Sequence, residues 1–396
     1  MKIVLVRHGY TKAYDESIYA GSLDTPLSIS GIEDIKKMAG KYTYPKTDMY
    51  FTSGMLRANQ TFELLYPDCQ LDGIIPNFKE HDGGPFEGKD RKEGISYHPS
   101  WLEGKTVGNQ ESYKDFEARV ISSLKDLYNK YHDKSVTIVT HAGVIRVIYS
   151  YLRKVSPQRQ NYMRIRNGGY YIFEVTKEDD ELTYTSFESF DNLPIYNYDD
   201  FKFVVIRHGL TNGNVALILT GCDVEYFLTE KGIKQLEERQ RTIDYPKTDM
   251  YFTSPMIRAK DTFRILYPGV KSNGEIYDLR ELSFGRYEAV SLYDIDFYGL
   301  FNEWLEDSHD MGFERYHKFS HRCARGFAEL VNRCGDNGAS SATLVCHMGT
   351  MRGILINIEK LNKFTYNDIQ ANNGGGHIVN LSINSEGYTI LKDEDI

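Results

Sequence analysis

The ten residues YPKTDMYFTS occupy positions 44–53 and recur, letter for letter, at 245–254, 201 residues further on. A second string recurs at nearly the same offset, as VRHG at 6–9 and IRHG at 206–209. Repeats in solenoid proteins are about 20–50 residues long, whereas a repeat of this length is the size of a whole domain. The sequence therefore predicts two tandem copies of one domain.

The length of the chain agrees with a duplication. At about 150 residues per domain, 396 residues correspond to two or three domains. We expect the first copy to span 1–190 and the second to span 201–396. Between them, DNLPIYNYDD at 191–200 is polar, contains a proline and stands directly before the apolar run FKFVVI, which restarts the pattern. This segment is predicted to be the linker.

Within each copy, short apolar runs alternate with helical patterns. Apolar side chains recur at helical spacing from Phe116 to Tyr131 and, in the second copy, from Phe319 to Val331. The runs expected to be strands are short, partly β-branched and bounded by polar, Gly or Pro residues. In the first copy they are KIVLV (2–6), DMYF (48–51), IIPNF (74–78) and SVTIV (135–139). Strands that alternate with helices predict an α/β fold with a mainly parallel sheet covered on both faces.

Each copy ends in a hairpin pattern. In the first copy YYIFEV and LTYTSF flank the polar segment TKEDDE within 170–187, and in the second HIVNLSI and YTILK flank NSEG within 377–392. Two β-rich runs separated by a few polar or glycine-containing residues are typical of antiparallel neighbours. We therefore expect a β-hairpin at the end of each domain.

Composition and charge exclude several classes of function. The net charge of −9, without Lys/Arg runs, argues against sequence-independent binding of nucleic acid, although a few converging arginines can still attract a small anionic substrate. The five cysteines form no C-x-x-C pair, which favours a reducing compartment over disulfides or zinc. No apolar run approaches the ~18 residues of a membrane span, and the first apolar stretch is too short for a signal peptide. We expect a cytoplasmic protein without nucleic-acid or membrane partners; its oligomeric state has no signal in the sequence.

Polar residues of a recurring kind follow the predicted strands, at the points where functional groups gather in open α/β sheets. Each copy supplies two arginines, two histidines and one glutamate from four separate strand ends. In the first copy these are Arg7, His8, Arg57, Glu80 and His141, and in the second Arg207, His208, Arg258, Glu281 and His347.

This set of side chains is sufficient to hydrolyse a phosphomonoester without a metal. Guanidinium groups and helix N-termini bind a phosphate dianion, and an unprotonated imidazole is a covalent nucleophile. A second imidazole can donate a hydrogen bond to the phosphoryl oxygens, and a carboxyl group can protonate the leaving alcohol and later activate water. The rival, a zinc or manganese site, lacks H-E-x-x-H or comparable spacing, and the adjoining arginines oppose a dication. We expect no metal and no cofactor.

The combination of motifs resembles that of the histidine phosphatase superfamily, also called phosphoglycerate mutase-like. The matching segments of the first copy are RHGYT (7–11), SGMLRANQT (53–61), KEHDGGPFEG (79–88) and VTHAGVIR (139–146). Those of the second copy are RHGLTNGN (207–214), SPMIRAKDT (254–262), RELSFGRYEA (280–289) and VCHMGTMR (345–352). The resemblance covers nearly all of both halves, and it implies a three-layer α/β/α fold with the site at the carboxyl ends of the strands.

The resemblance also implies a role for each residue of the set. The nucleophiles that become phosphorylated would be His8 and His208, and the proton donors Glu80 and Glu281. The residues that bind phosphate would be Arg7, Arg57, Arg207 and Arg258, and those that stabilise the transferring group His141 and His347.

The second copy follows the family pattern more closely than the first. The family has an asparagine six residues after the nucleophile that contributes to phosphate binding; this is Asn214 in the second copy, but the first copy has Tyr14. Behind the acid the second copy has the expected Phe284-Gly285, where the first has Gly83-Gly84. We expect altered phosphate binding in the first copy, although its five core residues are present.

Three functions fit this pattern. The preferred one is hydrolysis of small phosphorylated metabolites through a phosphohistidine. A phosphoglycerate mutase-type transfer is the enzymatic rival, but mutases of the family carry a longer insertion between the acid and the second histidine. Here His141 follows Glu80 by 61 residues and His347 follows Glu281 by 66, which favours hydrolysis. Alternatively, the first copy is a module that binds a phosphorylated ligand without turnover.

Overall fold

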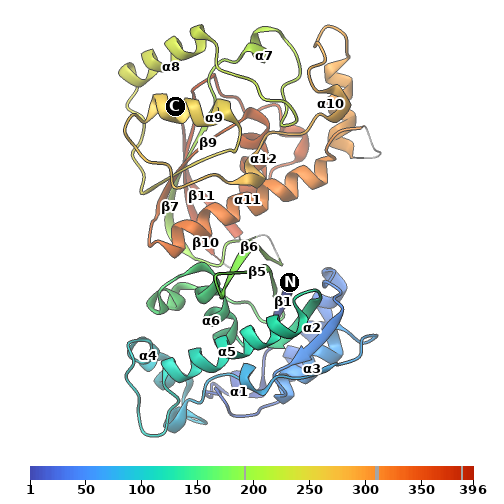
Figure 1. Cartoon of the computed structure of the whole chain (residues 1–396), viewed down its shortest axis with the longest axis vertical. Helices are drawn as coiled ribbons and strands as arrows, with labels where there is room; N and C mark the ends of the chain where they lie inside the picture. Colours follow the sequence, from blue (N-terminus) through green and yellow to red (C-terminus); the bar gives the residue numbers. More distant parts are fainter. Residues whose placement is uncertain (191–192, 308–311, 385–386) are drawn as a thin grey trace. The chain divides into compact units, whose positions relative to one another are not determined.

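The computed structural model describes residues 1–190, 193–307, 312–384 and 387–396. The chain separates into two compact units, unit 1 (Met1–Asp191) and unit 2 (Asn192–Ile396). Figure 1 traces the chain through both units in the colours of the sequence.

Each unit contains one mixed sheet. In unit 1 the strand order is β3-β2-β4-β1-β5-β6, in which β1 to β4 are parallel to one another and β5 and β6 run antiparallel. In unit 2 the order is β11-β10-β7-β9-β8, again with an antiparallel hairpin beside parallel strands. The bounds are β1 Lys2–Arg7, β2 Met49–Thr52, β3 Gly73–Ile74, β4 Ser135–Thr140, β5 Tyr170–Glu178, β6 Glu181–Ser189, β7 Tyr198–Arg207, β8 Met250–Thr253, β9 Ser341–Cys346, β10 Gly376–Asn384 and β11 Gly387–Asp395.

The helices of the two units correspond in order. Those of unit 1 are α1 Lys12–Asp15, α2 Ile29–Lys41, α3 Leu56–Leu65, α4 Arg91–Leu102, α5 Tyr113–Tyr131 and α6 Ala142–Arg153. Those of unit 2 are α7 Asn212–Val215, α8 Glu230–Thr242, α9 Ile257–Leu266, α10 Phe297–Glu306, α11 Tyr316–Asp336 and α12 Met348–Glu359. Hydroxyl side chains cap several N-termini, as Ser28 does for α2 and Thr229 for α8.

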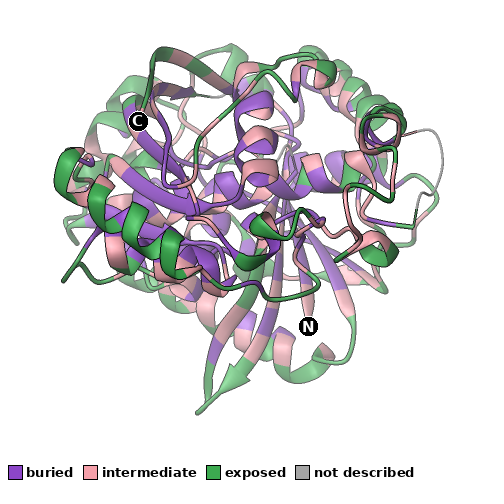
Figure 2. Ribbon diagram, turned by 90° about the horizontal axis from the view of Figure 1, so that it is seen from above, coloured by how far each residue is buried: buried purple, intermediate pink, exposed green. Residues whose placement is uncertain are grey.

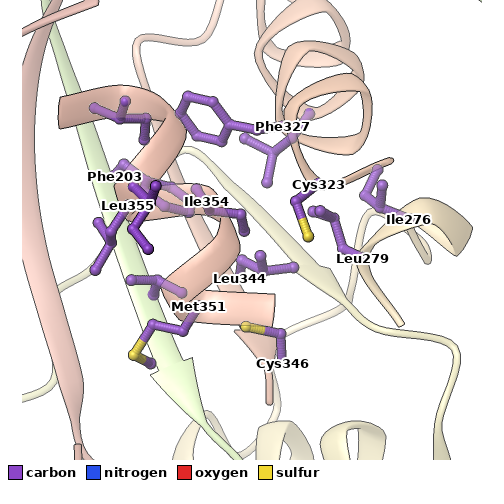
Figure 3. Close-up of a cluster of buried hydrophobic side chains, with 14 of the residues drawn as sticks. Phe203, Ile276, Leu279, Cys323, Phe327, Leu344, Cys346, Met351, Ile354 and Leu355 are labelled. Carbon is purple, nitrogen blue, oxygen red and sulfur yellow. The ribbon is translucent and has the colours of Figure 1, made fainter. Parts of the chain in front are cut away.

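The helices cover both faces of each sheet, because successive side chains of a strand point to opposite faces. In β7, Val204 and Ile206 pack against the side of α8 and α9, whereas Phe203 and Val205 belong to the cluster with α11 and α12. Figure 3 shows part of the second cluster, and Figure 2 shows buried residues concentrated on the strands and the inner faces of the helices. The predicted α/β fold with three layers is confirmed for each unit.

The closing hairpins are present as predicted, and they make the sheets mixed. The turn between β5 and β6 consists of Asp179 and Asp180, both with positive φ (48° and 65°), the backbone that a tight two-residue hairpin requires. In the second hairpin, residues 385 and 386 lie outside the described part of the chain. Among the described residues, no helix combines the length and apolar character needed to cross a membrane.

Two predicted segments differ in the structure. The run 74–78 is not a strand beyond Ile74, because Pro76 has no N–H to donate to a ladder; Pro76–Phe78 forms a 3₁₀ turn that buries Phe78. The described part of the predicted linker is packed within unit 2: the Ile195 N–H donates to Asn332 (2.9 Å), and β7 begins at Tyr198. Residues 191 and 192 of this linker lie outside the described residues.

Candidate active site

The predicted site residues of each unit meet at the carboxyl ends of the parallel strands. His8 follows β1, and His141 follows β4; their ring centroids are 5.0 Å apart. In unit 2, His208 and His347 are 5.2 Å apart after β7 and β9. Beside each pair lies a cavity, of about 210 Å³ in unit 1 and about 240 Å³ in unit 2.

Most of the predicted residues line these cavities. In unit 1 the wall includes Arg7, His8, Arg57 and Glu80, and in unit 2 it includes Arg207, His208, Asn214 and Glu281. The other three, His141, Arg258 and His347, are fully buried behind the wall and contact the residues that form it.

The tautomer of the first histidine is fixed by a backbone carbonyl. Nδ1 of His8 lies 2.7 Å from the carbonyl oxygen of Gly9, and Nδ1 of His208 lies 2.7 Å from that of Gly209. A carbonyl only accepts, so Nδ1 carries the proton and Nε2 keeps its lone pair. Desolvation, together with the neighbouring arginine of α3 or α9, lowers the pKa of both histidines well below the usual value. Each Nε2 is therefore available as a nucleophile.

The second histidine is bonded to the arginine at the start of the following helix. Arg57 Nε donates to Nδ1 of His141 (3.3 Å), and Arg258 Nε donates to Nδ1 of His347 (3.2 Å). A guanidinium only donates, so the histidine proton is on Nε2, which faces a serine hydroxyl in both units. In this arrangement the histidine orients the arginine; its donation to a phosphoryl oxygen stays a prediction.

The two buried arginines differ in how many of their N–H groups are in use. In unit 1, the Nη1 and Nη2 groups of Arg57 donate to the carbonyls of Leu23 (2.8 Å) and Gly21 (2.6 Å). In unit 2, Nη2 of Arg258 donates to Gly221 (2.7 Å), but Nη1 is buried and has no hydrogen-bond partner among the described residues. Unit 2 therefore keeps a donor that unit 1 has already used.

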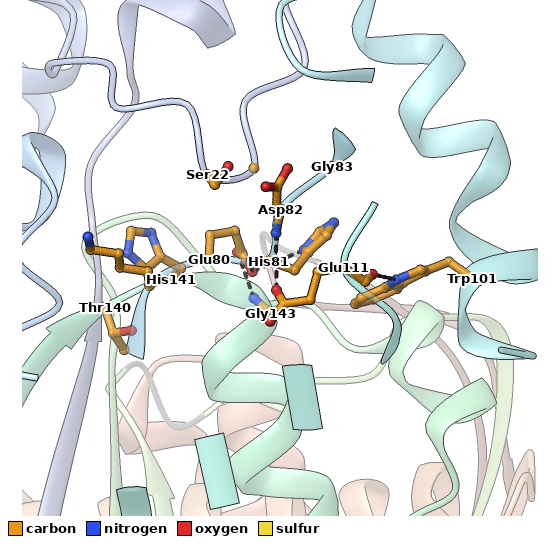
Figure 4. Close-up of polar contacts among 12 residues, drawn as sticks. Ser22, Glu80, His81, Asp82, Gly83, Trp101, Glu111, Thr140, His141 and Gly143 are labelled. Atoms are coloured by element: carbon orange, nitrogen blue, oxygen red, sulfur yellow. Dashed lines mark hydrogen bonds and ion pairs between the residues drawn. The ribbon is translucent and has the colours of Figure 1, made fainter. Parts of the chain in front are cut away.

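The glutamate lies at the N-terminus of the helix that follows the second histidine. Glu80 accepts from the Gly143 N–H (3.0 Å), and Glu281 accepts from the Gly349 N–H (3.0 Å). In unit 1, His81 also donates to Glu80 through Nδ1 (3.3 Å), as Figure 4 shows. Burial raises the pKa of Glu80, but the hydrogen bond and charge of His81 outweigh it, and the pKa lies well below its usual value. The predicted proton donor of unit 1 is thus held as a carboxylate.

An arginine of the long helix holds the loop that carries each glutamate. Arg119 donates to the backbone carbonyl of Glu80 (3.2 Å) and binds the Glu111 carboxylate (2.6 Å). In unit 2, Arg322 makes the matching contacts, to the carbonyl of Glu281 (3.3 Å) and to the Glu314 carboxylate (2.6 Å). These ion pairs, half-buried in unit 1 and largely buried in unit 2, hold the backbone of each glutamate from behind.

The residue six positions after the nucleophile takes different roles in the two units. Asn214 lines the cavity, and its Oδ1 accepts from the N–H (3.2 Å) and the hydroxyl (2.9 Å) of Thr211, so its amide NH₂ remains as a donor. Tyr14 also lines its cavity, but it lies between the ring of Tyr10, at 4.7 Å and tilted by 48°, and the guanidinium of Arg91 (4.3 Å).

Several residues at the site were not predicted. Asn167 and Asn373 donate to the backbone carbonyls of His8 and His208 (2.9 and 3.0 Å), and Arg146 and Arg352 line the cavities. The two asparagines stand in the similar segments RNGG (166–169) and NNGGG (372–376), and the two arginines stand in the last motif of each copy. A comparison of the two copies could therefore have identified these residues. His98 also lines the unit 1 cavity, and it contacts Asn161 (2.8 Å).

His81 and Trp101 also lie at the unit 1 cavity. Both are buried, their rings stack at 4.4 Å, and Trp101 donates from Nε1 to the carbonyl of Glu111 (2.7 Å). Across the described part of the chain, no three His, Cys, Asp or Glu side chains are grouped so as to hold a metal ion. The donors at both sites are those that bind anions.

Comparisons with known proteins agree with this geometry. The family model described as the histidine phosphatase superfamily (branch 1) matches residues 3–186 and again 203–395. The adenosylcobalamin/alpha-ribazole phosphatase of Escherichia coli (strain K12) is 25% identical over 186 residues, which are 45% of this chain and 92% of that protein. The metal-independent phosphoserine phosphatase of Arabidopsis thaliana is 28% identical over 168 residues, which are 39% and 70% of the two chains.

A solved structure, phosphoserine phosphatase from Entamoeba histolytica in complex with 3-phosphoglyceric acid, aligns with a TM-score of 0.41 and 23% identity, covering 47% of this chain and 96% of that one. Each of these relatives matches less than half of the chain, whereas the family model accounts for both halves. The chain therefore belongs to the histidine phosphatase superfamily, with two tandem copies of its branch 1 domain, and is a phosphoric monoester hydrolase.

Proposed function

We propose that both units hydrolyse small phosphorylated metabolites through a phosphohistidine, without a metal. The observation that carries this proposal is the pair His8 and His208, each with Nδ1–H bonded to a carbonyl and Nε2 unprotonated, beside an arginine-lined cavity. A cavity of about 200 Å³ suits a small metabolite, because sites for drug-sized ligands are about 300–1,000 Å³.

The reaction has two steps, described here for unit 2. Nε2 of His208 attacks phosphorus, the bond to the leaving oxygen breaks, and protonated Glu281 gives its proton to that oxygen. Water then attacks the phosphoryl group, the P–N bond breaks with its electron pair returning to Nε2, and the Glu281 carboxylate takes the proton of the water. The N–H groups of Arg207 and Asn214 stabilise the charge on the phosphoryl oxygens.

In unit 1 the proton has a further route. Tyr19 is hydrogen-bonded to Nε2 of His81 (2.7 Å), and Nδ1 of His81 faces Glu80 (3.3 Å). A proton on the His81–Glu80 pair can move to Glu80 as the leaving oxygen develops charge, so a carboxylate with a low pKa still serves as the donor.

The test is a rapid-quench experiment with a ³²P-labelled aryl phosphate. We expect an acid-labile, base-stable adduct on the wild type and none on His8→Ala/His208→Ala; His132→Ala, at an exposed histidine, is the control. Turnover should persist in EDTA, and vanadate should inhibit it. An adduct on Ser, Asp or Cys, or full activity of the double variant, contradicts the mechanism, and transfer to an added hydroxyl compound in place of water indicates a mutase-type reaction.

A further inference from the structure

The two cavities share the end that faces the nucleophile and differ at the other end. Arg146 of unit 1 and Arg352 of unit 2 line equivalent positions, as do the nucleophiles and the glutamates. The equivalence of the remaining walls is fixed by matching isolated β-bridges, between Ile18 and Asp90 in unit 1 and between Ile218 and Ser291 in unit 2. Wall positions can therefore be compared pair by pair.

Hydrogen-bonding side chains of unit 1 are replaced by hydrocarbon in unit 2. The pairs that line the two cavities are Tyr19 and Leu219, His81 and Leu282, and Arg91 and Leu292. His98 of α4 and Phe301 of α10 form a fourth pair, since each precedes the conserved tryptophan by three residues. One wall pair, Ala20 and Thr220, changes in the opposite direction, so four of these five substitutions make the unit 2 cavity less polar. This balance indicates that the two cavities accept different leaving groups.

The unit 1 cavity is lined by an arginine that forms no ion pair with any described residue. Arg91 is the first residue of α4, and no carboxylate of the described residues forms an ion pair with it. Its guanidinium lies over the ring of Tyr14 (4.3 Å), which holds it at the wall. The Asp90 carboxylate already caps α4 by accepting from the Lys92 N–H (2.7 Å), so the attraction of this wall for an anion rests on the guanidinium of Arg91. The cavity is lined by four arginines against one glutamate.

The unit 2 cavity continues into an apolar rim. Leu292 and Phe297 line it, and their chain neighbours Tyr293 and Tyr298 are 83% and 77% exposed. Beside Leu292, whose N–H donates to its carbonyl (2.8 Å), Leu217 is 43% exposed. Exposed apolar side chains grouped around a cavity mark a place where apolar surface is covered on binding.

Building on the proposed function, we propose that the two units divide the substrates between them. Unit 1 takes phosphomonoesters that carry a second anionic group, which Arg91 binds. Unit 2 takes phosphomonoesters of apolar or aromatic alcohols, which Leu219, Leu282 and Phe301 enclose.

The test uses two matched probes, phenyl phosphate and 4-carboxyphenyl phosphate, which differ by one carboxylate. His208→Ala leaves only the unit 1 site, and His8→Ala leaves only the unit 2 site. The ratio of kcat/KM for the carboxylated probe to that for the plain probe is expected to exceed one in His208→Ala and to be at least about tenfold lower in His8→Ala, a difference of one strong contact.

The contribution of Arg91 is isolated by exchanging it with its counterpart. Arg91→Leu in the His208→Ala background should lower the ratio about tenfold, and Leu292→Arg in the His8→Ala background should raise it. Lys92→Leu, the same change of charge at the exposed neighbour, is the control and should leave the ratio within about twofold. Arg91→Gln keeps a polar side chain in case the leucine variant does not fold.

The outcomes separate the two proposals. Equal ratios in His208→Ala and His8→Ala, or a ratio that Arg91→Leu and Leu292→Arg do not move, overturn the division of substrates while hydrolysis stands. Absence of hydrolysis of both probes by the wild type, with no phosphohistidine, overturns the proposed function itself.

Discussion

The protonation state of each residue at the two sites is set by one or two neighbours. The backbone carbonyl of Gly9 fixes the proton of His8 on Nδ1, and the guanidinium of Arg57 fixes that of His141 on Nε2. The second copy repeats both arrangements. The contacts of the glutamates differ, because only Glu80 is followed by a histidine. This single difference gives a pH dependence that can be measured.

We expect His81→Leu, which copies the residue of unit 2, to move the pH profile of unit 1. Without the hydrogen bond and charge of His81, burial dominates and the pKa of Glu80 rises. In the wild type the donated proton belongs to the His81–Glu80 pair, whereas in His81→Leu the carboxyl of Glu80 must carry it alone. A carboxyl loses its proton at lower pH than the pair, so the alkaline limb of kcat should move to lower pH, by about one unit or more. The measurement is kcat against pH in the His208→Ala background, with 4-carboxyphenyl phosphate.

Tyr19→Phe is the matched control for this prediction. It removes the hydroxyl bonded to Nε2 of His81 and leaves the contact between His81 and Glu80 in place. We expect a smaller displacement of the same limb. If His81→Leu leaves the limb where it is, Glu80 is not the acid of unit 1 or His81 does not control it.

At the scale of the elements, the turn Gly83-Gly84 behind Glu80 shows how an aromatic ring from another segment takes the place of a ring in the turn. The sequence suggests a looser turn at Gly83-Gly84, but a Cβ on Gly83 would lie 2.5 Å from the ring of Tyr19, and one on Gly94 would lie 2.2 Å from it. In unit 2, Leu219 stands at the position of Tyr19, and Phe284 stands at the position of Gly83. The aromatic ring comes from a different segment in each unit, so the glycines make room for Tyr19.

This close approach predicts a coupling between Gly94 and Tyr19. Gly94→Ala should lower the free energy of unfolding of unit 1 by about 1–3 kcal/mol, because the added methyl group overlaps a packed ring. In the Tyr19→Leu background the same change should cost at least about 1 kcal/mol less. Urea unfolding of the full chain, followed by tryptophan fluorescence, measures both.

Gly40→Ala measures how much a glycine-to-alanine change within a helix alters the free energy of unfolding when no ring is near. Gly40 lies in α2, and a Cβ there would meet nothing within 4 Å, so alanine should be neutral or stabilise by up to about 1 kcal/mol. Equal costs of Gly94→Ala with and without Tyr19 would show that the ring is not what requires the glycine.

The elements themselves were predictable where one local rule decided them. Strands β1, β2 and β4 are short apolar runs whose ends carry the site residues, and the structure places them as expected. The run 74–78 failed because Pro76 removes a ladder donor, although its apolar residues resemble a strand. The exchange of ring position between Tyr19 and Phe284 was not visible in the sequence, since it depends on contacts between distant segments.

For the whole molecule, the duplication could be predicted because a ten-residue identity survives in both halves. The ten core site residues could be proposed from the same duplication, because motifs that occur in the same order in both halves have few alternative explanations. The character of each cavity could not be predicted. The wall residues Arg91 and Leu292, or His98 and Phe301, stand in segments where the copies share no string, and only the bridges and the tryptophans bring them into register.

All residues that line each cavity belong to one unit, so we expect the two sites to contribute separately to turnover. On phenyl phosphate, His208→Ala should remove most of the activity and His8→Ala should leave most of it. Unit 2 keeps at its cavity the amide donor of Asn214, where unit 1 has Tyr14. A hydrogen bond to a charged group contributes about 1.5–3 kcal/mol, or roughly one to two powers of ten.

The measurement is kcat/KM and kcat of both single variants and of His8→Ala/His208→Ala. If the sites are independent, the residual activities of the two single variants add up to that of the wild type at every substrate concentration. The difference between them should be larger well below saturation, because a missing phosphate donor weakens binding before it limits turnover. Equal losses of activity in the two single variants, or a larger loss from His8→Ala, would mean that the extra phosphate donor of unit 2 does not set the rate. If the residual activities do not add up to that of the wild type, one site alters the other.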